Sequence, residues 1–400
     1  MGAGQTIEAG ISQEVVDLLY LCGRALEGEP AQPERIRQMN LARVHALAED
    51  QSLSALAWYG LESGTGQLAV SGTLIDAWRA ERDRAVRRQM LFDAERAQIF
   101  AWMRDSGIWH APLKGAVLAD WYPRMGMREF SDYDILYDAT RRADLVGFFK
   151  ARGYHVNSND HPAALDDSFT KEPVYNFEMH RRLFLGYYSH ALTSYFDEMA
   201  DRLVSVDGSP YCLRQTSEDF YLYLIAHARK HHEISGTGVR ILCDLQVFLA
   251  HEGTNLDRNY VERQFDTLGI GEFGRALERL AACVFACDFD PEELRDDDLE
   301  TLRGLTSHGT YGTIDHFTEL TLEREKQQVG SAGEYVLKRI VPDDEWWKFN
   351  SPFGFKHKWA RGPLLLFRAA RAAVKPERRR RAVAELRAVI RKNREDSSDV

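Results

Sequence analysis

Polar and apolar side chains alternate in the stretch Ser131-Asp132-Tyr133-Asp134-Ile135-Leu136. This alternation predicts a β-strand, because successive side chains of a strand point to opposite faces. Asp132 and Asp134 then share one face, and Tyr133 and Ile135 share the other, where apolar packing can hold the strand. Two such carboxylates can bind a Mg²⁺ ion jointly, since Mg²⁺ takes hard oxygen ligands and shares its shell with substrate phosphates. The stretch therefore predicts a metal site on one face of a sheet.

A positive charge precedes this strand, in the pair Lys114-Gly115. Residues 109–113 are predicted to form a strand and residues 116–121 a short helix, so this pair lies in a strand-to-helix turn. Such a turn offers free backbone N–H groups to an anion, and Lys114 adds a point charge for a phosphate. The sequence thus predicts a phosphate-binding turn beside the carboxylates.

The rest of the pattern predicts a mostly helical protein with one α/β insert. Apolar residues recur at helical spacing over residues 11–106, with a long helix at 78–103 and a break at 60–72, and again beyond the turn at 207–210 to about residue 302. Between these regions four strands are predicted, at 109–113, 132–137, 154–157 and 174–180, with helices at 116–121 and 140–152. The polar residues 159–171 predict a mobile loop. A last helical region follows the turn at 351–354.

Composition limits the class of protein. The 400 residues are 44% hydrophobic and 28% charged, as in a soluble globular protein with two or three cores. No stretch approaches the roughly 20 apolar residues that cross a bilayer, and the N-terminus lacks a signal-peptide pattern. We therefore expect no membrane insertion and a cytoplasmic location. The five cysteines are scattered, without a Cys-x-x-Cys pair, which predicts reduced thiols.

Charge is distributed unevenly along the chain. The net charge is −10, which argues against a general nucleic-acid coat. The last part of the chain is nevertheless basic, with Lys356, Lys358, Arg361, Arg368, Arg371, Lys375, the run Arg378 to Arg381, Arg387, Arg391, Lys392 and Arg394. This region is either a solvated helix face or a binding surface for RNA, a polyphosphate or an acidic partner.

A series of short motifs connects these segments. In order, they are Leu113-Lys114-Gly115-Ala116, Tyr122-Pro123, Arg128, Asp132-x-Asp134-Ile135-Leu136, Gly153-Tyr154, Glu178-x-His180, His227-x-x-Lys230-His231, and Arg240 with Asp244-Leu245. The series resembles an uncharacterised nucleotidyltransferase family, which is similar to the larger polymerase-beta-like nucleotidyltransferase superfamily. The resemblance spans about residues 96–249. An ordered series is much more specific than any one motif.

The resemblance implies an α+β fold, with a small mixed β-sheet nucleotidyltransferase core embedded in a largely α-helical protein. It also implies a nucleoside triphosphate such as ATP, held by Mg²⁺ or alternatively Mn²⁺. Two acids on one strand and a third on its neighbour bind the metal; here these are Asp132, Asp134 and Glu178. Glu178 would bind a second metal ion or take the proton from the incoming hydroxyl. Lys114-Gly115 stands where the superfamily's Gly-Ser turn is expected, so an ammonium replaces a hydroxyl.

Further residues are expected to contact the nucleotide or its phosphates: Lys114, Gly115, Arg128, His180, His227, Lys230, Arg240 and Asp244. Several have alternatives that the sequence leaves open. Arg128 suits a phosphate oxygen, or is an ion-pair partner that positions Asp132. Glu178 could be an exposed strand residue paired with a neighbouring arginine. Arg240 and Asp244 have the spacing of a helical ion pair.

The predicted organisation has four parts. Residues 1–95 form an N-terminal helical region, residues 96–206 the nucleotidyltransferase core, residues 207–330 a helical domain that closes over the site, and residues 331–400 a basic helical region. The expected activity is metal-dependent transfer of a nucleotidyl group from an NTP to an acceptor that the sequence does not identify. Two alternatives remain: a non-catalytic nucleotide-binding scaffold subunit, and a toxin-like nucleotidyltransferase that modifies tRNA or protein.

Overall fold

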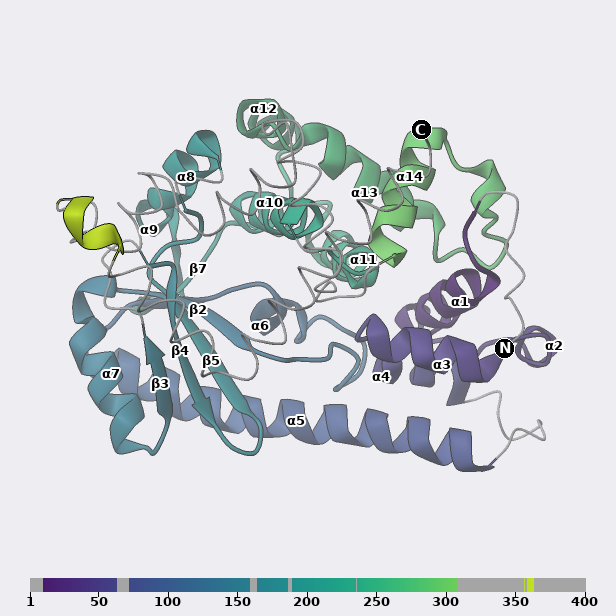
Figure 1. Ribbon diagram of the computed structural model, residues 1–400, viewed down its shortest axis with the longest axis horizontal. Helices are drawn as coiled ribbons and strands as arrows, with labels where there is room; N and C mark the ends of the chain where they lie inside the picture. Colours follow the sequence, from purple (N-terminus) through teal and green to yellow (C-terminus); the bar gives the residue numbers. More distant parts are fainter. Residues whose placement is uncertain are drawn as a thin grey trace. The chain divides into compact units, whose positions relative to one another are not determined.

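The computed structural model describes residues 10–62, 72–158, 164–185, 189–234, 236–307, 356 and 358–362 (Figure 1). The chain divides into two compact units. The first comprises Met1–Asp160, Ala164–Lys230 and Thr237–Thr310; the second comprises His161–Ala163, His231–Gly236 and Tyr311–Val400. Apart from Lys356 and the short helix η4 (Lys358–Ala360) with the two residues after it, the predicted region 331–400 lies outside the described residues. The binding of RNA, a polyphosphate or an acidic partner by this basic region therefore stays a prediction.

The N-terminal region is helical, as predicted. Its helices are α1 (Gln13–Glu27), α2 (Pro33–Ile36), α3 (Leu41–Asp50) and α4 (Ser54–Glu62). Gly28 ends α1 in the left-handed conformation, with φ 73°. Helices α1 and α4 approach so closely that a Cβ at Gly60 would collide with the carbonyl oxygen of Leu21. Backbone contact of this kind is possible only without a side chain.

Helix α5 (Gly72–Asp105) connects this region to the sheet (Figure 1). Its 34 residues include the predicted helix at 78–103. Trp78 belongs to the core of the N-terminal helices, where its Nε1 donates a hydrogen bond of 2.7 Å to the carbonyl of Ser54. Phe92, Ile99 and Met103 belong to the core under the sheet. One helix therefore serves both cores, and the predicted boundary between residues 95 and 96 falls inside it.

The sheet contains seven strands in the order β3-β4-β5-β2-β1-β7-β6. The strands are β1 (His110–Pro112), β2 (Tyr133–Tyr137), β3 (His155–Ser158), β4 (Asp166–Lys171), β5 (Tyr175–His180), β6 (Val204–Val206) and β7 (Ser209–Arg214). Strand β2 pairs with β5 in parallel and with β1 antiparallel, so the sheet is mixed. Helices α6 (Gly115–Leu118) and α7 (Arg142–Ala151) lie between these strands in the chain. The α+β class predicted from the sequence is confirmed.

Two predictions about this region are wrong. Residues 166–171, expected in a mobile loop, form β4, while residues 159–163 lie outside the described residues. The polar residues of this segment suggested a loop, but Asp167 is fully buried in an ion pair with Arg142. Two nitrogens of the guanidinium donate to its two carboxylate oxygens at 2.9 Å and 3.0 Å. The helical pattern expected beyond the turn at 207–210 begins later, at Ser217, because Ser209–Arg214 form β7. Asp207 and Gly208, with φ 52° and 75°, form the turn between β6 and β7.

The helices after the sheet form the upper part of Figure 1. They are α8 (His190–Asp197), α9 (Met199–Arg202), α10 (Ser217–Ile234), α11 (Arg240–Glu252), α12 (Arg258–Leu268), α13 (Gly271–Cys283) and α14 (Asp296–Thr306). None of the helices in the described part of the chain combines the length and the apolar character that crossing a membrane requires.

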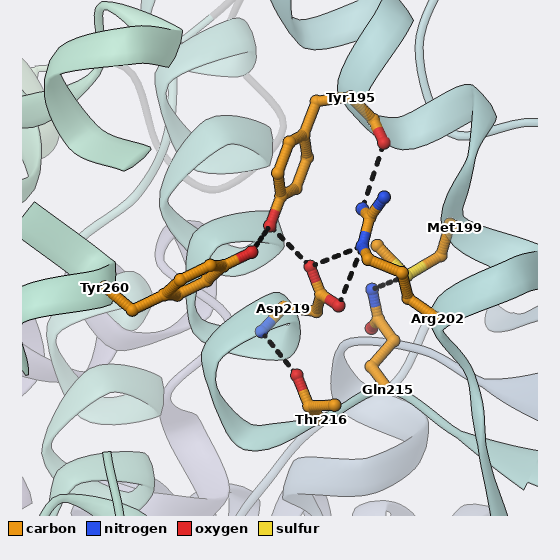
Figure 2. Close-up of polar contacts among 7 residues, drawn as sticks. All are labelled: Tyr195, Met199, Arg202, Gln215, Thr216, Asp219 and Tyr260. Atoms are coloured by element: carbon orange, nitrogen blue, oxygen red, sulfur yellow. Dashed lines mark hydrogen bonds and ion pairs between the residues drawn. The ribbon is translucent and has the colours of Figure 1, made fainter. Parts of the chain in front are cut away.

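A polar network joins four of these helices (Figure 2). Its centre is the carboxylate of Asp219 on α10, which is 2% exposed. Tyr195 of α8 donates to it at 2.6 Å, and Arg202 of α9 donates at 3.1 Å. The hydroxyls of Tyr195 and Tyr260 of α12 lie 2.8 Å apart. Because buried polar groups are costly unless paired, this network fixes the start of α10 relative to its neighbours.

Candidate active site

Asp134 and Glu178 lie side by side on the two central parallel strands. Asp134 of β2 is the direct partner of Glu178 of β5 in the sheet register. His180 follows on the same face of β5, because side chains two residues apart share a face. The ligand atoms of these three residues all lie within 4.8 Å of one another. The other face carries the aromatic core, which includes Tyr133, Ile135, Phe177 and Met179.

Two donors hold the carboxylate of Asp134. Nζ of Lys114 lies 2.9 Å from its Oδ1, and Nε2 of His180 donates to the same oxygen at 2.7 Å. Burial disfavours the charge of Asp134, but the ammonium of Lys114 and the hydrogen bond from His180 outweigh burial and hold the pKa of Asp134 well below its usual range. Asp134 is therefore ionised at neutral pH although it is 5% exposed.

Glu178 has the opposite electrostatic character. Burial raises its pKa, and the charges of Asp134 and Asp132 raise it further, to about 8. Nε2 of His180 lies 3.9 Å from its Oε2, too far for a hydrogen bond. Two neighbouring carboxyl groups thus differ in protonation at neutral pH, because two like charges side by side disfavour ionisation of both.

Asp132 precedes β2 and lies outside the compact ligand group. It accepts a hydrogen bond of 3.1 Å from the hydroxyl of Ser131. Its charge nevertheless affects the pKa of Glu178 and of Lys114, so the carboxylate lies near both. The structure brings Glu178 beside Asp134, and His180, expected to contact the nucleotide, lies in the same group. The metal role of Asp132 stays a prediction.

The turn at Lys114 differs from the expected anion-binding turn. Lys114 has φ 48°, which is unusual for a residue other than glycine. The N–H groups of Ala116 and Val117 donate to the carbonyls of Leu113 and Lys114. Two of the donors predicted to be free at the start of this short helix are therefore already paired. The strained backbone instead directs the Lys114 side chain to Asp134.

Gly115 is required by the close approach of Arg128. A Cβ at Gly115 would lie 2.9 Å from Cζ of the guanidinium. The guanidinium cannot move freely, because its Nε and Nη2 donate to the two carboxylate oxygens of Asp244 at 2.7 Å and 3.0 Å. Tyr122 donates a third hydrogen bond to Asp244, at 2.8 Å. This buried cluster favours a positioning role for Arg128 over contact with a phosphate.

The structure does not pair Asp244 with Arg240 as the helical spacing suggested. Asp244 is bound by Arg128 and Tyr122, as described above. Arg240 donates instead to the carbonyl of Glu129 at 3.4 Å. Since Arg128 also donates to this carbonyl, at 2.9 Å, α11 is tied to the segment that leads into β2. The expected role of these residues in closing over a nucleotide stays a prediction.

Helix α10 brings a second lysine to the site. The charges of Lys114, Asp134, Asp166 and Glu178 all affect Lys230, whose pKa is lowered to about 8, mainly by burial and then by Lys114. Its ammonium lies 5.9 Å from the ring centre of Phe184. No ion pair to Lys230 occurs within the described residues. A partly buried ammonium without a carboxylate partner is costly, and an anionic ligand would relieve that cost.

The comparisons with known proteins support the resemblance seen in the sequence. A model of a family described as uncharacterised nucleotidyltransferase matches residues 37–286, well over half of the chain. The protein belongs to this nucleotidyltransferase family. No curated protein and no solved structure matches the chain.

In this nucleotidyltransferase, sequence reasoning missed two residues at the site. Asp166 was assigned to a loop, but it pairs with His180 in the sheet and influences Glu178 and Lys230. Tyr223 is 1% exposed, and a hydrogen bond connects it to Lys114. Its position, four residues before His227 and seven before Lys230, places it on the same face of α10. That spacing was a signal in the sequence.

Proposed function

We propose that this protein transfers a nucleotidyl group from a nucleoside triphosphate to an acceptor, with a divalent metal ion bound by Asp134 and Glu178. One observation carries the proposal: the ligand atoms of Asp134, Glu178 and His180 lie within 4.8 Å of one another on one sheet face. Membership of a nucleotidyltransferase family supports this reaction class. Asp132 is the further carboxylate near enough to join them.

The donor set fits a hard divalent cation such as Mg²⁺. Because Nε2 of His180 donates to Asp134, the imidazole orients that carboxylate, and oxygens of Asp134 and Glu178 remain as ligands. Nδ1 of His180 is buried and has no hydrogen-bond partner within the described residues. A bound cation would also lower the pKa of Glu178, which crowding now raises to about 8. Mn²⁺, which also takes carboxylate and water ligands, is the alternative ion.

The metal, when bound, neutralises phosphate charge and keeps the attacking and leaving oxygens in line. The chain's own cations contribute beside it. Lys114 would exchange its contact with Asp134 for a phosphate oxygen, and Lys230 would gain the anionic partner that it lacks. Both ammonium groups are point charges, which can contact a phosphate oxygen without the planar, two-pronged geometry of an arginine.

Glu178 would act as a metal ligand or would accept the proton of the attacking group, because a bound cation would keep its carboxylate ionised. The acceptor is a small molecule, a peptide product, a protein side chain or an RNA end, each of which can present a nucleophile.

The proposal is tested with radiolabelled NTPs. The full chain is incubated with each α-³²P-labelled NTP, Mg²⁺ and a cell extract, and labelled products are separated. Transfer of label that needs both the protein and Mg²⁺ is the expected result, and Glu178→Gln should abolish it. Absence of transfer with all four NTPs, together with absence of NTP binding, would contradict the proposal.

A second function, as a non-catalytic nucleotide-binding subunit, is favoured by one contact. The ammonium of Lys114 lies 2.9 Å from Oδ1 of Asp134, so a cation of the chain already neutralises this carboxylate. If this ion pair persists when nucleotide is bound, the ammonium of Lys114 supplies the positive charge that a metal ion would otherwise supply. NTP binding that is unchanged by Mg²⁺ in calorimetry, with no transfer of label, would select this function over the enzyme.

A further inference from the structure

A second group of potential metal ligands lies on the N-terminal helices, away from the strands. His45 and Glu49 are one turn apart on α3, and Glu81 comes from α5. Their ligand atoms also lie within 4.8 Å of one another. Nε2 of His45 donates to Glu81 at 2.9 Å, and Nδ1 lies 3.9 Å from Glu49. The ring of Trp78, 4.9 Å from that of His45, fixes the imidazole from one side.

Carboxylates and guanidinium groups both surround this imidazole. Glu49, Glu81 and Glu129 line the same cavity as three arginines, Arg84, Arg87 and Arg88. The side chain of Glu81 is 14% exposed and that of Glu49 is 55% exposed, so a cation can reach both carboxylates. Arg84 is the cation that contacts Glu81, at 3.6 Å, but its side chain is 61% exposed. Exposed ion pairs of this kind contribute little, so Arg84 can be displaced by a cation bound at the carboxylates.

A cavity gives access to the group. It has a volume of about 490 Å³ and is lined by Glu49, Glu81, Glu129 and Ser54, among others. A cavity of this size beside two carboxylates has room for several water molecules.

We propose that His45, Glu49 and Glu81 bind a divalent transition-metal ion, whose remaining coordination positions open to this cavity. An imidazole with two carboxylates suits Zn²⁺, Mn²⁺ or Co²⁺ better than Mg²⁺ or Ca²⁺, which prefer oxygen ligands alone. Glu49 and Glu81 both line the cavity, which supplies an entry path for the ion and room for water as a further ligand. The site shares no residue with Asp134, Glu178 and His180, so it does not depend on the proposed function.

The test counts Co²⁺ ions bound by the full chain. Co²⁺ is titrated against wild type and against Glu178→Gln, in which the strand site is weakened, and visible absorption reports coordination by nitrogen and oxygen. Glu178→Gln should retain one saturable Co²⁺ ion. Adding Glu81→Gln should weaken its binding by about tenfold or more, and Co²⁺ should no longer raise the melting temperature.

Two further variants sharpen the result. Arg84→Ala should bind Co²⁺ more tightly, because the competing cation is removed. Asp76→Asn, which changes an exposed carboxylate on the same helix, should bind as wild type does. If Glu178→Gln shows no saturable site, or if Glu81→Gln and Glu49→Gln both leave the affinity unchanged, the proposal is overturned. If Glu178→Gln fails to fold, the single variant Glu81→Gln is compared with wild type instead. It must bind one Co²⁺ ion fewer than wild type for the proposal to stand.

Discussion

Nζ of Lys114 lies 2.9 Å from Oδ1 of Asp134, so a fixed ammonium shares an oxygen with the proposed metal site. The contact explains two features at once. It keeps Asp134 ionised despite burial, and it places a cation at the turn that the sequence predicted to bind phosphate. The proposed reaction requires Lys114 to leave Asp134 when metal and nucleotide bind.

Replacing Lys114 with Met should therefore change metal and nucleotide binding in opposite directions. One charge-assisted hydrogen bond is worth about 1.5–3 kcal/mol, so Mn²⁺ should bind the nucleotide-free variant about tenfold more tightly. NTP should bind more weakly, because a phosphate partner is lost. Calorimetry measures both affinities. Lys150→Met, at an exposed position on α7, is the control, and weaker Mn²⁺ binding by Lys114→Met would refute the competition.

Lys230→Met should stabilise the nucleotide-free protein at neutral pH. The folded pKa of Lys230 is about 8, below the unfolded value of 10.5, so folding disfavours its charged form. Below pH 8 both states are protonated and the full penalty applies; between pH 8 and 10.5 wild type recovers that stability. At pH 7 the variant should melt about 2 °C higher or more, and the difference should shrink as the pH rises. A lower melting temperature at pH 7 would show that Lys230 is not an unpaired charge.

The fold class could be predicted from the sequence because alternation on β2 and β5 is clear. The register that brings Asp134 beside Glu178 could not, since it depends on strand pairing between distant segments. Strand β4 was missed for a physical reason: Asp167 looks like a loop residue until Arg142 pairs with it inside the fold. Propensity alone cannot anticipate such compensation.

The candidate site was predictable where residues share a strand or helix. The common face of Glu178 and His180 follows from strand periodicity, and both lie at the ligand group. The partner of Arg128 could not be inferred, because Asp244 lies 116 residues away in the chain. The i,i+4 spacing suggested Arg240 as the partner of Asp244, but Asp244 pairs with the distant Arg128 instead.

Gly115→Ala should destabilise the fold. The added methyl group would lie 2.9 Å from the guanidinium of Arg128, which Asp244 holds in place. Overpacking against a fixed group costs roughly 1–3 kcal/mol, measurable by urea denaturation. Gly147→Ala on α7 is the matched control, because nothing lies within 4 Å of the new Cβ; it should be neutral or stabilising by up to about 1 kcal/mol. Equal effects of the two substitutions would refute the close approach.

Asp219→Asn should loosen the helices that meet in Figure 2. The substitution removes the charge that Arg202 and Tyr195 share, and leaves the guanidinium without its carboxylate. A loss of about 1–3 kcal/mol in the free energy of unfolding is expected. Asp197→Asn on α8 serves as control, since Asp197 contacts Arg182 at 3.4 Å in an ion pair near the surface. Unchanged hydrogen exchange in α10 would contradict the anchoring role.

The most direct test of the central claim is calorimetric binding of NTP with and without Mg²⁺, comparing wild type with Glu178→Gln. Glu178 is the better residue to change, because its raised pKa makes the neutral glutamine a close match to the metal-free side chain. Wild type should bind NTP at least about 100-fold more tightly with Mg²⁺, and Glu178→Gln should lose that gain while keeping its melting temperature. Full Mg²⁺-dependent binding by a folded Glu178→Gln protein would contradict the account.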